Sequence, residues 1–195
     1  MARLLEFPLT LLARTIVCLG LAGALTLGAA GVSAQELAKV DAQAFPWAAE
    51  KWPFPIDQWG AGQAFGCAAE RCGGEVHLYL RAKIGFCRCA SGVSDDDEIE
   101  RVGDLELIGP DYKAPVAGHP VTAGLMTGRA RVYAVARPLQ SALPVLTIAL
   151  ANKCDAIVAT VTAEPKAQSV AETHALDFLR SAEVQHWVEA QRGTP

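Results

Sequence analysis

The fold is decided by the stretch GCAAERCGGEVHLYLRAKIGFCRC, residues 66–89. Within it, residues 75–84 alternate between apolar and polar side chains, which is the period of a β-strand with one face turned to a core. We therefore expect a half-buried strand here, with one set of side chains pointing inward and the other pointing away. The inward set is Val76, Leu78, Leu80, Ala82 and Ile84, and the outward set is His77, Tyr79, Arg81 and Lys83.

Four of the six cysteines flank this strand, at Cys67, Cys72, Cys87 and Cys89. In an exported protein such cysteines form disulfides by default, because compartments outside the cytoplasm are oxidising. Cys87 and Cys89 lie about 6.5–7 Å apart and side by side in an extended chain, so a bond between them would be strained. We therefore expect two disulfides in which each of these reaches back to Cys67 or Cys72. Cys154 is the candidate unpaired thiol.

The same cysteines allow two alternative functions. The four thiolates Cys67, Cys72, Cys87 and Cys89 could hold a copper or zinc ion, although their spacing matches no standard zinc ribbon. Alternatively, Cys87 and Cys89 could form an exchanging redox pair activated by the cation between them. In the preferred reading the cysteines are structural and no cofactor is expected.

Residues 1–34 are expected to be an export signal. Arginines supply positive charge, residues 15–31 form an uncharged run of apolar and small side chains, and residues 32–34, VSA, resemble a cleavage site before Gln35. Cleavage would leave no stable membrane span and would place the protein in the periplasm or outside the cell.

The charge after cleavage limits the choice of partners. The full chain has 17 basic and 21 acidic residues, and the signal takes two of the first and one of the second, which leaves a net charge of −5. Nucleic acid is an unsuitable partner, because phosphate binding needs clustered lysine and arginine. The sequence holds no nucleophile elbow, phosphate loop or zinc-protease motif, so no catalytic residue is assigned.

The segment 35–62 is rich in proline and aromatic residues, and prolines at three of its positions favour an extended path. Its rings could dock a protein partner, since aromatic side chains are favoured at interfaces. The alternative, which we favour, is that they cover the core of their own domain, because soluble monomers seldom expose large apolar patches. The candidate docking residues are Trp47, Trp52, Phe54 and Trp59.

Residues 63–192 are expected to form one disulfide-stapled α+β domain. Besides residues 75–84, the pattern predicts strands at 63–67, 129–137, 144–151 and 156–163, the last two forming a hairpin. Residues 109–128 are expected to be a loop. Helices are predicted to begin at Ser94, at a Ser169–Glu172 capping box and again at Ser181.

The fold expected from these elements is an antiparallel sheet of about four or five strands, with the C-terminal helix packed on one face. The function expected is that of a small, exported, non-catalytic accessory or binding protein stabilised by disulfides. Metal binding is the first alternative and thiol–disulfide exchange the second.

Overall fold

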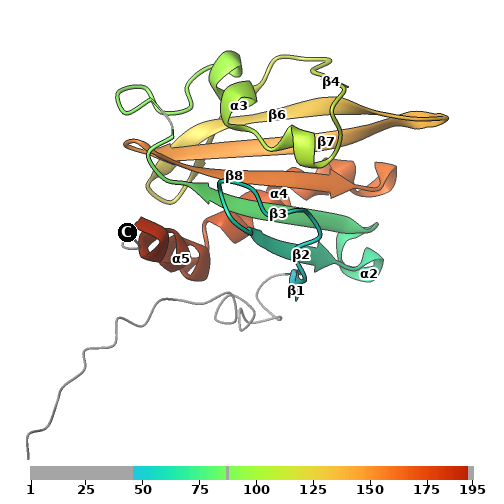
Figure 1. The fold of residues 1–195 in the computed structure, drawn as a ribbon. Helices are drawn as coiled ribbons and strands as arrows, with labels where there is room; N and C mark the ends of the chain where they lie inside the picture. Colours follow the sequence, from blue (N-terminus) through green and yellow to red (C-terminus); the bar gives the residue numbers. More distant parts are fainter. Residues whose placement is uncertain (1–45, 87, 193–195) are drawn as a thin grey trace, which may run out of the picture. The chain divides into compact units, whose positions relative to one another are not determined.

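The computed structural model describes residues 46–86 and 88–192 (Figure 1). The expected signal and Cys87 lie outside the described residues. Within them, one antiparallel sheet has the strand order β1-β2-β3-β8-β7-β6-β4, and β5 also pairs with β6. The strands are β1 (Ala48–Glu50), β2 (Gln63–Cys67), β3 (Val76–Lys83), β4 (Tyr112–Lys113), β5 (His119–Ala123), β6 (Met126–Arg137), β7 (Gln140–Asn152) and β8 (Asp155–Ala163). The helices are α2 (Ala69–Cys72), α3 (Asp96–Val102), η1 (Leu105–Leu107), η2 (Pro165–Ala167), α4 (Gln168–Leu179) and α5 (Ala182–Arg192).

The expected sheet of four or five strands with one C-terminal helix is wrong: the sheet has eight strands and helices on both faces. The additional strands β1, β4 and β5 are short and come from segments with many prolines and glycines, which favour a loop. Pro120 lies within β5, whose described pairing is to β6 alone. An edge strand tolerates proline because its outer N–H groups have no partner to lose. Residues 109–128 are therefore partly strand.

The centre of the sheet agrees with the sequence pattern. β3 pairs with β2 on one side and with β8 on the other, and Val76, Leu78 and Leu80 are fully buried. β7 and β8 form the expected hairpin, with Asn152 paired to Asp155 across a turn of two residues. Lys153 occupies the first turn position with φ of 59°, a left-handed conformation that is common in such tight turns.

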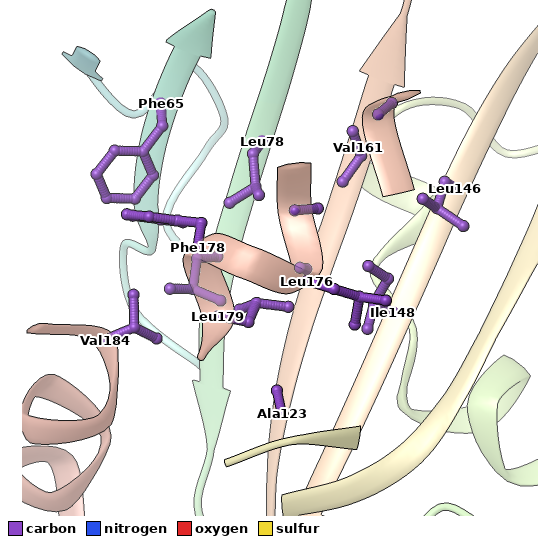
Figure 2. Close-up of a cluster of buried hydrophobic side chains, with 14 of the residues drawn as sticks. Phe65, Leu78, Ala123, Leu146, Ile148, Val161, Leu176, Phe178, Leu179 and Val184 are labelled. Atoms are coloured by element: carbon purple, nitrogen blue, oxygen red, sulfur yellow. The ribbon is translucent and has the colours of Figure 1, made fainter. Parts of the chain in front are cut away.

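One face of the sheet is covered by α4 and α5. Figure 2 shows Phe178 and Leu179 of α4 directed at the sheet, with Phe65 of β2 beside them. The Ser169–Glu172 capping box does not form, since the chain enters α4 directly from η2 and no side chain caps the helix. The expected restart at Ser181 is confirmed, because its hydroxyl accepts a hydrogen bond from the amide of Val184 at 3.3 Å.

The opposite face is covered by α3 and η1, which Figure 1 shows on the other side of the sheet from α4. The cap of α3 is Asp95 instead of the expected Ser94, and its side chain accepts from the amide of Glu98 at 2.7 Å. Ile99 and Val102 of α3 pack in a cluster that includes Val158 of β8. Since both faces are covered, the middle of β7 and β8 is buried without alternation and mostly apolar, with Thr147 and Thr160 as buried polar residues.

Candidate functional site

Arg81 and Lys83 are buried, with exposed fractions of 1% and 3%. The alternation of β3 favours solvent for both, and that expectation is wrong. β3 lies in the interior of the sheet, and its second face is covered by the loop between β1 and β2 and by the segment around Asp104. Two cations therefore lie below the surface on one strand, which requires carboxylate partners nearby.

The partners of these cations come from two separate loops. Nη1 of Arg81 donates to Oδ2 of Asp57 at 2.8 Å and to Oδ1 of Asp104 at 3.4 Å. The ammonium group of Lys83 lies 2.8 Å from the same oxygen of Asp104 and donates to the carbonyl oxygen of Val102 at 2.7 Å. Asp104 is buried, whereas the side chain of Asp57 is 43% exposed. The ion pair between Arg81 and Asp57 thus joins a buried side chain of β3 to a partly exposed side chain of the loop between β1 and β2.

The carboxyl group of Asp57 is held in its charged form. Burial raises its pKa, but hydrogen bonds from the amide of Trp59 and from Arg81, together with the charges of Arg81 and Lys83, outweigh this effect and leave the pKa lowered.

The sequence reasoning missed Asp57 and Asp104. The signal that could have identified the cluster is the pair of cations in a strand that carries no other full charge, because charged groups in a central strand need partners. Asp57 is 24 residues and Asp104 is 23 residues from Arg81 along the chain, so spacing alone does not single them out.

Residues 51–62 form a cover over this face of β3, which we call the aromatic strap. Trp52 packs edge-on against Tyr79 at 6.2 Å, and its ring lies over the guanidinium of Arg81 at 5.1 Å. The ring passes so close to Gly62 that a side chain at this position would collide with it and with the carbonyl of Leu80. The strap is therefore fitted to β3 by ring contacts and by the absence of a side chain at Gly62.

Four rings lie next to one another over the surface of β3, two of them from the strap and two from β3 itself. We call them the aromatic row: Trp52, Phe54, Tyr79 and His77. Phe54 lies 4.8 Å from Tyr79 in an edge-on contact, and His77 lies parallel to Tyr79 at 6.4 Å. His77 also pairs with Glu50 of β1 at 3.0 Å. That side chain reaches His77 across Gly66 of β2, where a Cβ would leave it no room.

An open groove of about 310 Å³ begins at His77, at the end of the aromatic row. Its lining includes Leu143, Pro144 and Thr162, together with the charged residues Arg137, Glu75 and Glu164. A larger groove of about 620 Å³ lies at the edge formed by β4 and β6, away from these rings, and is bordered by Glu100, Glu106 and Asp111.

The candidate docking residues of the sequence analysis separate onto the two faces. Trp47 is buried against Phe178 at 6.0 Å, on the face covered by α4. Trp52 and Phe54 are half-buried in the aromatic row, and Trp59 packs on Phe86 at 4.6 Å with Lys83 below its ring. Three of the four rings thus lie together on the strap, and the fourth belongs to the core.

α3 carries a second charged cluster. Asp96 accepts hydrogen bonds from Nη2 of Arg129 at 2.6 Å and from the amide of Gly118 at 3.0 Å. Glu98 pairs with Arg101 at 2.6 Å. The acidic residues Asp96 and Glu98 at the start of this helix therefore pair with particular arginine side chains. They also interact favourably with the positive end of the helix dipole.

Acid should destabilise the protein through Asp96. The hydrogen bond from Gly118 is the largest cause that lowers the pKa of Asp96, burial opposes it, and Arg129 lowers the pKa further. A carboxyl whose pKa is lower in the folded state stabilises the fold above its unfolded pKa of about 4, and this contribution is lost as pH falls through the folded value.

We therefore expect Asp96→Asn to lower the urea midpoint at neutral pH and to reduce the loss of stability as the pH falls below about 4. The control is Asp97→Asn, an exposed neighbour on the same helix. Equal acid dependence in wild type and Asp96→Asn would contradict this assignment.

Two disulfides are present, as expected, but their pairing differs. Cys67 bonds Cys72, and Cys89 bonds Cys154, which the sequence analysis leaves unpaired. α2 brings Cys67 and Cys72 together, with their Cα atoms 6.1 Å apart. The register of β3 on β8 places the chain that leaves β3 beside the β7–β8 turn, where Cys154 lies.

The metal alternative gains no support. Cys67, Cys72 and Cys89, three of its four ligands, are held in disulfides, and the fourth lies outside the described residues. Residues 46–86 and 88–192 contain no cluster of three or more histidine, cysteine or acidic side chains placed to hold a metal ion. In the same residues no helix is both long and apolar enough to cross a membrane.

The fold and these contacts define a disulfide-bonded protein built on one antiparallel sheet, with two helices on one face and a helix and an aromatic strap on the other. No protein-family model matches the chain, and no curated protein matches it either.

Proposed function

We propose that this chain is an exported, non-catalytic binding protein that contacts a protein partner through the aromatic row and the groove beside it. The observation that carries the proposal is the position of Trp52, Phe54, Tyr79 and His77. They form a continuous row of half-buried or partly exposed rings that ends at a groove of about 310 Å³.

The export part of the proposal is supported by the disulfides. The Cys89–Cys154 bond joins residues 65 apart in the sequence, so it ties together two distant parts of the folded chain. Such bonds persist in the periplasm and outside the cell and are rare in the cytoplasm. The apolar N-terminal segment that precedes the domain in sequence agrees with this location.

The contact part is supported by the chemistry of the row. Tryptophan, tyrosine and arginine are the side chains that contribute most at protein interfaces, because each combines a large apolar area with a polar end. Here the rings end at a groove whose lining includes Leu143 and Pro144, together with charged residues of both signs. A partner strand or loop with an apolar side chain fits this arrangement.

Photo-crosslinking in living cells tests the contact. A photoreactive phenylalanine analogue replaces Phe54, and the control carries it in place of Leu125, which is 92% exposed in the β5–β6 turn. We expect a discrete adduct from position 54 that is absent from position 125 and is lost with Tyr79→Ala. Equal adducts at both positions, or none at position 54, would contradict the proposal. The export part is checked by the mass of the exported protein, which should begin at Gln35.

A further inference from the structure

The guanidinium of Arg81 is buried, and the two nitrogens that carry three of its five N–H groups have no hydrogen-bond partner among the described residues. Nη1 donates to Asp57 and Asp104, but Nε and Nη2 have no partner among the described residues. A buried donor without an acceptor is costly, and charged donors are the most costly. Since the exposed fraction of Arg81 is 1%, bulk solvent does not satisfy these two nitrogens.

Other buried polar groups on this face of the sheet also lack a hydrogen-bond partner among the described residues. The indole nitrogen of Trp52, whose ring lies over Arg81, is buried and has no partner among the described residues. Two hydroxyl groups, of Thr160 and Thr147, are also buried and unpaired. In the strand register Thr160 of β8 lies opposite Tyr79 of β3, and Thr147 of β7 lies opposite Thr160. Both threonine side chains are therefore on the face of the sheet that carries Arg81, at the next register position on that face.

The nitrogens of Arg81 and Trp52 can only donate hydrogen bonds, whereas each threonine hydroxyl can both donate and accept. What Nε and Nη2 of Arg81 lack is an acceptor with several lone pairs. Both neighbouring carboxylates bond Nη1, which leaves the Nε–Nη2 edge of the guanidinium free. That edge presents two parallel N–H groups, the arrangement that binds both oxygens of a carboxylate.

We propose that Arg81 anchors a buried binding site for a small monocarboxylate, held by Nε and Nη2 beneath the aromatic strap. The ligand has to be small because Arg81 is almost fully buried, with the ring of Trp52 5.1 Å from its guanidinium. It enters when the strap lifts, which requires the bond between Asp57 and Arg81 to open. Asp57 is suited to that step because its side chain is 43% exposed and it comes from the strap, whereas Asp104 is buried.

Asp57 also sets the affinity of the site. Its negative charge on Nη1 offsets the charge of Arg81 and weakens the attraction for a second carboxylate. Replacing it with asparagine should tighten binding by about tenfold, the change that corresponds to one charge-assisted hydrogen bond. The site shares Trp52 with the proposed partner contact, but acetate binding tests the site and crosslinking tests the contact, so either proposal can fail alone.

Nuclear magnetic resonance on the ¹⁵N-labelled protein tests the site, with acetate as the probe and chloride at equal ionic strength as the reference. The Arg81 Nε–H resonance is assigned by its absence from Arg81→Lys, which keeps the charge and loses the fork. We expect this resonance and the indole resonance of Trp52 to shift and saturate with acetate and not with chloride. No saturable shift, or the same shift with chloride, would show that only water meets these donors and would overturn the proposal.

The variants give a second measurement that does not depend on Arg81→Lys folding. Asp57→Asn should bind acetate about tenfold more tightly than wild type. The matched control is Asp177→Asn, which removes an exposed carboxylate that pairs with Arg180 at 2.9 Å on α4, on the other face. It changes the net charge equally and should leave the affinity unchanged. Equal effects of the two substitutions, or weaker binding in Asp57→Asn, would overturn the proposal.

Discussion

Replacing Phe178 with alanine should lower the free energy of unfolding by about 3–5 kcal/mol. The side chain is fully buried on α4, with the ring of Phe65 at 4.8 Å and the ring of Trp47 at 6.0 Å. Phe178 therefore joins α4, β2 and the residues that precede β1 in a single contact. Truncation leaves a cavity that three separate elements would have to close, so we expect a cost near the top of the range.

The measurement is the urea midpoint at constant slope, followed by circular dichroism. Leu179→Ala, on the same turn of α4 and also fully buried, should cost about 2–5 kcal/mol. Leu125→Ala is the control, since this side chain is almost fully exposed and should change the midpoint by less than about 0.5 kcal/mol. An unchanged midpoint in Phe178→Ala would mean that α4 is peripheral to the stability of the sheet.

Removing the Cys89–Cys154 disulfide should cost roughly 4 kcal/mol, about twice the cost of removing Cys67–Cys72. The first bond joins residues 65 apart and the second joins residues 5 apart. A cross-link that closes a longer loop removes more conformational entropy from the unfolded chain. The long loop contains every helix and strand from α3 to β7, including the segment around Asp104, so loss of the bond affects the face that carries the Arg81 cluster.

The two bonds are compared by paired replacement with serine, Cys89→Ser with Cys154→Ser and Cys67→Ser with Cys72→Ser, because paired replacement leaves no new free thiol. We expect the first pair to give the lower denaturation midpoint and faster amide exchange around Asp104. Peptide mapping of the native protein should show the two bonds as the structure has them. A lower midpoint for the second pair would contradict the loop-length argument.

The sequence predicts the middle of this fold well because local patterns dominate there. The alternation from Val76 to Leu80 identifies β3, and the apolar runs around Asn152 identify the β7–β8 hairpin. The number of disulfides follows from the count of cysteines and from the oxidising compartment that the N-terminal segment indicates. Each of these inferences depends on residues close together in the chain, where spacing is a direct guide to geometry.

The edges and the second face could not be predicted in the same way. β1, β4 and β5 are strands because β2 and β6 offer them free edges, and their own sequences favour loops. The aromatic strap and the segment around Asp104 cover the second face of β3, so this alternating strand has buried charges at Arg81 and Lys83. An alternating pattern shows that the two faces of a strand differ in polarity. It does not show whether the polar face is exposed to solvent or covered by another segment.

The amino-acid pattern alone is therefore enough to predict the strand at β3, the terminal helices and the presence of two disulfides. Which cysteines pair, which carboxylates meet Arg81 and which ring covers it become visible only in the folded chain. These contacts join residues from 5 to 65 positions apart, and most of them depend on the order and register of strands. Strand order is a property of the whole sheet, since each strand pairs where its neighbours leave an edge and a face to cover.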